Sequence, residues 1–128
     1  MKIITIKQPW AHLIAEGFKD IENRAWKTDF RGKLGIHVGK SMTDINDSLI
    51  VKLIEREHIP LPSIESLKNQ QGFIIATVDL TRIERDSTNF WAIPGQFHWK
   101  LESPQKIEPV AAIGKLGLWN FDLDLELT

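Results

Sequence analysis

The side chains best suited to chemistry gather in one segment, QPWAHLIAEGFKDIENRAWKTDFRG, residues 8–32. Lys19, Glu22 and Arg24 follow one another at spacings of three and two, and Trp10 and Trp26 flank them. A carboxylate within about 4–6 Å of a lysine and an arginine fixes the ionisation of all three groups, and such a pair can also transfer a proton. Arginine binds phosphate through two parallel hydrogen bonds, and tryptophan offers a flat face on which a base can stack.

Two interpretations of this segment remain open on residue types alone. In the first, the cations, the acid and the rings form a site for a nucleobase attached to a phosphate. In the second, Trp10 and Trp26 belong to the core, and the acid and the arginine form a structural ion pair.

Charge is distributed unevenly along the 128 residues. The formal net charge is −1, but residues 1–40 have eight Lys/Arg and four Asp/Glu, and the other 88 residues have eight and thirteen. A locally basic region on a nearly neutral protein suits a small anionic ligand or a short nucleic-acid contact better than a long duplex. With no signal-peptide pattern and no apolar stretch near 18 residues, we expect a cytoplasmic protein without a membrane partner.

The usual motifs of metal and nucleotide-cofactor enzymes do not occur in the sequence. There is no cysteine, which excludes disulfides, thiolate metal sites and cysteine nucleophiles. The four histidines are scattered, without HxH or HxxxH spacing, at His12, His37, His58 and His98. No GxSxG, GxGxxG or GxxxxGK motif is present. We therefore expect neither a metal nor a cofactor.

Short elements must position the residues of the first segment. A strand at 3–6 leads into a helix that begins at Pro9 and ends at Gly17. Residues 19–26 predict a strand on which Asp20, the glutamate, the arginine and Trp26 share one face, because strand side chains alternate. The other face of that strand has Ile21, Asn23 and Ala25.

The rest of the chain predicts an α+β domain, with residues 1–128 as a single unit. Further strands are expected at 34–38, 73–80, 96–101, 110–113 and 118–121, an amphipathic helix from 41–44 towards Pro60, and loops at 69–72 and 82–89. Five to seven short strands with two or three helices predict a small β-barrel flanked by those helices.

The N-terminal segment resembles the opening of the ASCH domain, the activating signal cointegrator-1 homology domain of the PUA-like superfamily. The matching pattern is QPWA, G-x-K-x-x-E-x-R-x-W, RG and IH, which here are residues 8–11, 17–26, 31–32 and 36–37. GFIIATVDL and PVAAIGKLGLW extend the similarity over most of the chain. The resemblance implies a PUA-like β-barrel, in agreement with the reading from the residues.

The resemblance also implies a cleft that holds RNA, another single-stranded nucleic acid, or a nucleoside or nucleotide, including one with a modified base. The residues it assigns to this cleft are Gln8, Trp10, Lys19, Glu22, Arg24, Trp26 and Lys40. Lys19 and Arg24 would contact phosphate or a base edge, and Glu22 would accept from a base amino group. Trp91 and Trp99 either stack on the ligand or pack in the core, the commoner place for a tryptophan.

An enzymatic alternative stays open. Some small members of the family resemble amidohydrolases that deacetylate N4-acetylcytidine with a lysine, a threonine nucleophile and a glutamate, and another branch cleaves RNA. Lys19 matches the lysine, but Glu22 stands where the threonine would be, Thr28 lies beyond the motif, and Asp79 corresponds to the second acid. Lys19 and Glu22 would then act as a proton-transfer pair.

A protein-interaction domain is the third possibility. It would require an exposed apolar patch, which the sequence does not make obvious. The oligomeric state is not specified by the sequence.

Overall fold

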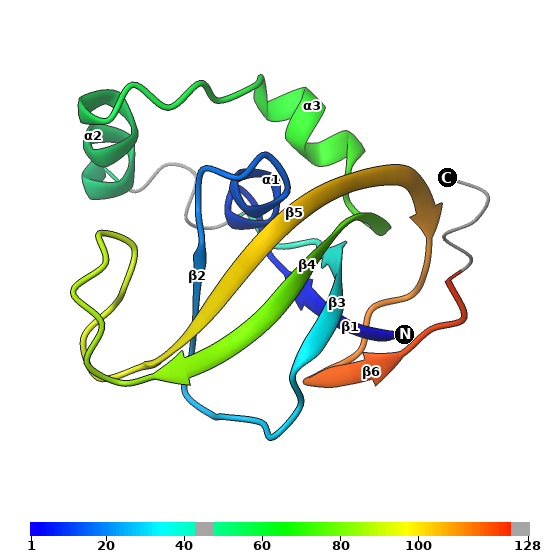
Figure 1. Cartoon of the computed structure of the whole chain (residues 1–128). Coiled ribbons are helices and arrows are strands. Elements are labelled where there is room, and N and C mark those ends of the chain that lie inside the picture. The colour runs from blue at the N-terminus through cyan, green and yellow to red at the C-terminus, as the bar shows by residue number, and fades with distance from the viewer. Residues whose placement is uncertain (43–47, 124–128) are drawn as a thin grey trace.

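The computed structural model describes residues 1–42 and 48–123, and this part of the chain has six strands and three helices. The strands are β1 (Lys2–Ile6), β2 (Ile21–Arg24), β3 (Gly32–Val38), β4 (Phe73–Glu84), β5 (Phe97–Ala111) and β6 (Leu118–Asn120). The helices are α1 (Trp10–Ala15), α2 (Ser48–Arg56) and α3 (Ile64–Asn69). All strands join one curled sheet in the order β2-β5-β4-β3-β1-β6, with the helices on one side of it (Figure 1). The structure confirms the α+β class expected from the sequence. The curled sheet forms a half-barrel.

The sheet is antiparallel except where β1 pairs with β3 in parallel. The connection between these two strands holds α1 and β2, which is the segment with the lysine, glutamate and arginine. Register shifts along β4 and β5 mark β-bulges, which bend a strand and increase its twist. The bending brings the β2 edge of the sheet back towards β1, although three strands stand between them in the sheet order.

The main core fills the space between α1 and the sheet. Alternation along β1 and β3 sends every second side chain to this core, and α1 adds a buried apolar face. Its members include Ile4, Ile6, Ala11, Ile14, Leu34, Ile36, Val38, Ala76, Val78 and Trp99. Gly17, with a φ of 83°, ends the turn after α1 as predicted.

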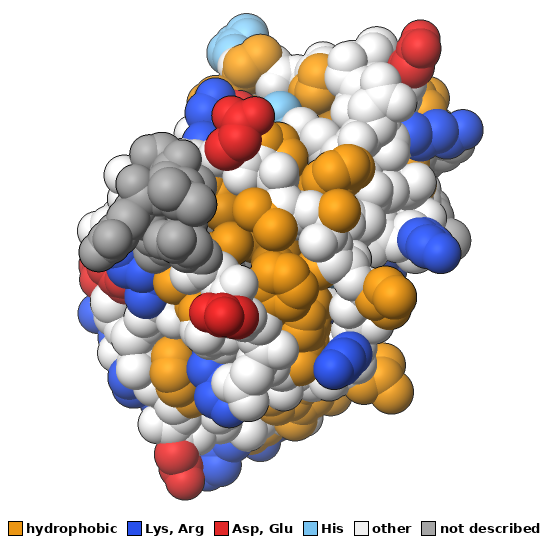
Figure 2. All heavy atoms as spheres, turned by 90° about the vertical axis from the view of Figure 1, so that its right-hand side faces the viewer, with side chains coloured by type: hydrophobic (Ala, Val, Ile, Leu, Met, Phe, Trp, Pro, Cys, Tyr) orange, Lys and Arg blue, Asp and Glu red, His pale blue; other side chains and the backbone are white. Residues whose placement is uncertain are grey.

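A second, smaller core lies on the other face of the sheet. Ile3 and Ile74 pack there against Trp119 of β6, and Phe121 and Leu123 lie at its margin. Figure 2 views the side of the molecule where β6 and the N-terminus lie, and apolar side chains form a band across it. The segment between β5 and β6 adds Ile113 and Leu116, which are 88% and 98% exposed. The structure thus has more exposed apolar surface than the sequence suggested.

Two expected strands and one expected loop are corrected. The strands at 96–101 and 110–113 are parts of the single strand β5, which passes through Pro104 and Pro109. These prolines fall at the register shifts of the β4–β5 ladder, where a missing N–H removes no ladder hydrogen bond. Likewise β4 continues to Glu84, into the expected loop at 82–89.

The helical region between β3 and β4 also differs from the expectation. α2 begins at Ser48, and the expected start at 41–44 lies partly outside the described residues. α3 was not expected, but Ser63 caps it, because its Oγ accepts the Ser66 N–H at 3.1 Å. No helix in the described ranges is long and apolar enough to cross a membrane.

Candidate functional site

A cleft of about 990 Å³ opens beside β2, between the end of β1, the residues after β3, α2 and the segment that joins β4 to β5. Six of the residues predicted for a ligand site line it: Trp10, Lys19, Glu22, Arg24, Trp26 and Lys40. Apolar walls with a few converging charged groups are typical of ligand sites. The motif read from the sequence is therefore gathered in one place.

The Glu22 carboxylate lies between two cations. Its Oε1 is 3.4 Å from Lys19 Nζ, and its Oε2 accepts from Arg24 Nε at 3.0 Å. Lys19 Nζ also donates to the Ile21 carbonyl. Glu22 and Arg24 share a face because they are two residues apart on β2, whereas Lys19 precedes the strand and does not follow its alternation. We call these three side chains the ion-paired row.

Burial governs the ionisation of the lysine in this row. Lys19 is 4% exposed, and burial lowers the pKa of its ammonium below the ordinary lysine value, although Glu22 acts to raise it. Its Nζ lies 5.6 Å from the centre of the Trp10 ring. A lysine with a lowered pKa can give up a proton closer to neutral pH than an exposed one.

Aromatic rings stand at both ends of the ion-paired row. At the Lys19 end, Trp10 meets Trp91 edge-on with ring centres 6.3 Å apart, and Phe90 meets Trp91 at 4.7 Å. At the Arg24 end stands Trp26, backed by Trp99 at 4.9 Å. Trp91 lines the cleft, whereas Trp99 is fully buried and donates from Nε1 to the Trp26 carbonyl. Trp91 therefore belongs to the cleft and Trp99 to the core.

Comparison with known protein families matches residues 4–111 to the ASCH domain. The chain belongs to the ASCH family. Domains of this family generally bind RNA. A search of curated proteins found no match. The match includes the ion-paired row and both aromatic ends of the cleft, and β6 follows it in the chain.

One wall of the ASCH cleft was not predicted from the sequence, apart from Trp91, for which stacking on the ligand was one of two possibilities. The segment 85–96, here called the aromatic loop, contributes Phe90, Trp91, Ala92, Ile93, Pro94 and Gln96 to the lining. Asn23 fastens it to β2: its Nδ2 donates to the Trp91 carbonyl at 3.0 Å, and its Oδ1 accepts from the Ile93 N–H at 2.9 Å. Asn23 was placed on the opposite strand face from Glu22 and Arg24, yet it also lines the cleft, where its side-chain amide binds this loop. The adjacent Phe90 and Trp91 in a loop were the available signal, since loops with large side chains often form binding sites.

Gln8 lies outside the cleft of the ASCH domain and fastens two helices together. It is fully buried, and its Nε2 donates to Gln70 Oε1 at 2.7 Å and to the Leu67 carbonyl at 3.3 Å. Its Oε1 accepts from the His12 N–H at 3.0 Å. The glutamine of the QPWA motif thus connects α1 to the end of α3.

Three further side chains named from the sequence also lie elsewhere. Asp79 lies opposite Lys33 in the backbone register of β4 and β3, and it is not among the residues that line the cleft. Thr28 accepts the Phe30 N–H at its hydroxyl. Asp20 binds Lys100 and Asn89 rather than a cleft group, so strand alternation did not place it in the site.

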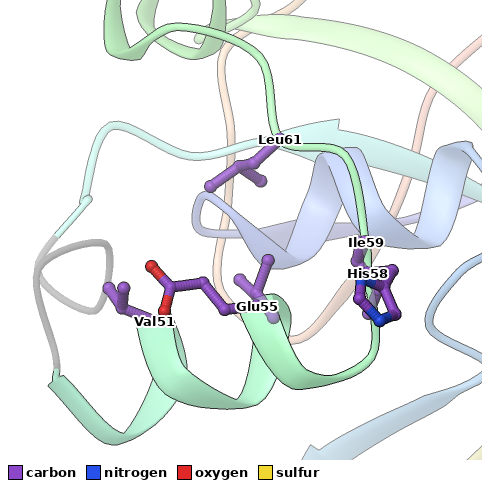
Figure 3. Close-up of a pocket in the computed structure, with 6 residues that line it drawn as sticks. Val51, Glu55, His58, Ile59 and Leu61 are labelled. Atoms are coloured by element: carbon purple, nitrogen blue, oxygen red, sulfur yellow. The ribbon is translucent and has the colours of Figure 1, made fainter.

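A second hollow of about 290 Å³ lies between α2 and the chain that follows it (Figure 3). Its described lining is largely apolar, with Glu55 and His58 as the ionisable groups. It lacks the cations and rings of the ASCH cleft. Within the described residues, no three His, Asp or Glu side chains come together as a metal-binding group.

Proposed function

We propose that this ASCH domain binds single-stranded RNA or a nucleotide in the cleft beside β2. The observation that carries the proposal is the combination, in one cleft, of tryptophans at both ends of a row of charged groups. Tryptophan suits a base and arginine suits a phosphate or a base edge. A modified base belongs to the same class of ligand.

Arg24 is the best-placed cation for the ligand. Its Nε and Nη2 donate to Glu22 and to the Thr5 carbonyl, which holds the guanidinium plane in one orientation. Within the described part of the chain, Nη1 has no protein acceptor and lies on a side chain that is 24% exposed. A held guanidinium loses little entropy when it binds, so Nη1 can donate to a phosphate oxygen or to a base.

Glu22 has capacity left for a ligand. A carboxylate offers about four lone-pair sites; Arg24 Nε and Nη2 both lie within 3.0 Å of Oε2, whereas Lys19 Nζ is the one contact on Oε1, at 3.4 Å, among the described residues. A base amino group can therefore donate to it without breaking either ion pair. The ion-paired row has two cations for one carboxylate, and Lys7 and Lys40 also line the cleft, so the excess of cations makes it attractive to an anion.

The form of the cleft favours a single strand over a duplex. Its rings lie within a hollow, and a base reaches them only when it is unstacked from its neighbours. A duplex would leave its bases stacked and present phosphates alone. The near-neutral charge of the chain also suits a short contact better than a long backbone track.

Fluorescence anisotropy of a labelled eight-nucleotide single-stranded RNA, at low salt, tests this function. We expect Arg24→Ala to weaken binding by about tenfold or more, because it removes a held guanidinium from the cleft. Arg82→Ala is the matched control, since Arg82 is an exposed arginine on β4 with its own carboxylate partner, Glu84. Equal weakening by the two variants, or no binding by the unaltered protein, would overturn the proposal.

A hydrolase is the second candidate, favoured by the lowered pKa of Lys19 beside Glu22. In this reaction Glu22 takes a proton from water, the resulting hydroxide attacks the amide carbonyl, and the Lys19 ammonium gives a proton to the departing amine. The products from N4-acetylcytidine are cytidine and acetate. Mass spectrometry of that nucleoside and of a short RNA, after incubation with the protein, tests it: a product that Glu22→Gln abolishes establishes the enzyme, and no product excludes it for these substrates.

A further inference from the structure

The cleft has two aromatic ends, and the ion-paired row separates them. Trp10 lies beside Lys19 at one end, with Trp91 and Phe90 in edge contact behind it. Trp26 follows Arg24 by two residues along the chain, at the other end. The four residues of β2, Ile21–Arg24, lie between Lys19 and Trp26 in the chain and span about 10 Å at 3.3 Å per residue. The rings also form two separate groups, because Trp91 contacts Trp10 and Phe90, whereas Trp26 contacts Trp99.

We propose that the cleft holds two consecutive nucleotides, with one base at Trp26, the next at the Trp10–Phe90–Trp91 end, and the phosphate between them at Arg24. This inference rests on the proposed function and adds to it the length and arrangement of the ligand. The second end is a separate base subsite, built mainly by the aromatic loop.

The volume of the cleft agrees with a ligand of this length. Pockets for drug-sized ligands range over roughly 300–1,000 Å³, and this cleft has about 990 Å³. A mononucleotide would leave one aromatic end in water. A second base covers that end and buries apolar surface that is otherwise hydrated.

The second subsite is held in place before any ligand binds. Asn23 binds the backbone on both sides of Ala92, through the Trp91 carbonyl and the Ile93 N–H. Trp91 Nε1 donates to the Phe18 carbonyl at 2.9 Å, which fixes the indole ring in its own plane. A preorganised ring loses little entropy when a base stacks on it. Asn23 is therefore a positioning residue for the second base.

Isothermal titration calorimetry with a series of 5′-phosphorylated adenylates tests the inference. The series consists of AMP, the dinucleotide pApA, the trinucleotide pApApA, and a dinucleotide whose second unit has ribose phosphate without a base. Stacking of one base on an aromatic side chain changes affinity by about 5- to 150-fold. We expect pApA to bind at least fivefold more tightly than AMP, the abasic dinucleotide to lose this gain, and a third nucleotide to add less than twofold.

Phe90→Ala and Ile64→Ala form a matched pair for this test. Phe90 and Ile64 are exposed apolar side chains, at 41% and 49%, but Phe90 lines the cleft and Ile64, on α3, does not. We expect Phe90→Ala to reduce the AMP-to-pApA ratio of Kd values towards one and Ile64→Ala to leave that ratio unchanged. Asn23→Asp, which removes the donor to the Trp91 carbonyl, should reduce the ratio as well, whereas a general loss of stability would weaken both ligands alike.

The outcomes separate this inference from the proposed function. If AMP and pApA bind equally, the two-nucleotide arrangement is wrong and the single-base site survives. If the abasic dinucleotide matches pApA, the gain comes from phosphate and the second base subsite is again wrong. If no member of the series and no longer single-stranded RNA binds, the proposed function itself fails, and this inference fails with it.

Discussion

Arg24 and Thr5 are joined by a hydrogen bond of 2.9 Å from Nη2 to the carbonyl oxygen, although three strands separate β2 from β1 in the sheet order. The bond crosses the open side of the half-barrel. Arg24 therefore ties the β2 edge of the curled sheet to the end of β1 with the same guanidinium that we propose for the ligand. Stability and binding are coupled at this residue.

Arg24→Lys separates charge from geometry. The variant keeps the positive charge, but a single ammonium cannot reproduce the planar fork that reaches Glu22 and Thr5 together. We expect the free energy of unfolding, measured by urea denaturation, to fall by about 1–3 kcal/mol. Arg82→Lys, at an exposed site, should change it by less than about 0.5 kcal/mol. Equal stability of the two variants would show that Arg24 does not close the half-barrel.

The lowered pKa of Lys19 predicts a particular pH dependence of stability. Between the folded-state pKa and the unfolded value of about 10.5, the unfolded chain holds a proton that the folded chain has released, so stability rises with pH in this window. Below the folded-state pKa, Lys19 is protonated in both the folded and the unfolded chain. The free energy of unfolding is then lowered by the full cost of burying the ammonium. Lys19→Met removes the titration.

Urea denaturation near neutral pH and again at about pH 10 measures this dependence. The stability of the unaltered protein minus that of Lys19→Met should increase towards the higher pH. A difference that stays constant or decreases contradicts a lowered pKa for Lys19.

The salt dependence of the RNA-binding constant measures how many phosphates the protein contacts. For single strands, the slope of log K against log salt concentration is about −0.7 per neutralised phosphate. Two or three phosphates give a slope between about −1.4 and −2.1. We expect Lys40→Ala, at the cleft rim, to reduce the slope by about 0.7.

Lys33→Ala is the control for that measurement, because Lys33 is an exposed lysine of β3 outside the cleft. It should leave the slope unchanged. A slope near zero, or the same change in both variants, would show that the phosphates do not lie at this rim.

Gly114→Ala probes the segment that follows the ASCH match. A Cβ at this position would lie 2.8 Å from His37 Cε1 and 3.0 Å from Thr5 Oγ1. The His37 ring is held between the Thr5 hydroxyl and the Ala112 carbonyl, so it has little room to yield. We expect the free energy of unfolding to fall by about 1–3 kcal/mol in thermal or urea denaturation, against little change for Lys115→Ala next to it.

The elements with clear periodicity could be predicted from the sequence, as could the ion-paired row. β1, α1, β3 and the first part of β4 are short apolar stretches with clear boundaries, so the sequence predicted their type and position. The burial of β3 and β4 is nearly continuous rather than alternating, because both faces of these strands are covered. The ASCH motif placed Lys19, Glu22 and Arg24 in one site. Strand alternation accounts for Glu22 and Arg24 alone, because Lys19 lies before β2.

Features that depend on distant contacts could not be predicted. The two halves of β5 read as separate strands, because the bulges that accommodate Pro104 and Pro109 are properties of its pairing with β4. Trp91 belongs to a loop without periodicity, and its place in the cleft is set by Asn23 and Phe18, far away in sequence. Gln8 was assigned to the cleft because it stands in the motif, but α3, which was not expected, supplies its partners.

The pairing of β2 has a consequence for the order of folding. β2 finds its sheet partner in β5, with Ile21 opposite Lys100, so the strand that holds Glu22 and Arg24 stays unpaired during synthesis until most of the chain has emerged. Closing so long a loop costs conformational entropy before the β2–β5 hydrogen bonds form. Strand pairs between segments far apart in the sequence therefore form slowly. The cleft is therefore among the last parts to assemble. In a refolding experiment, recovery of ligand binding should follow the slowest phase rather than the collapse of the β1–β3–β4 core.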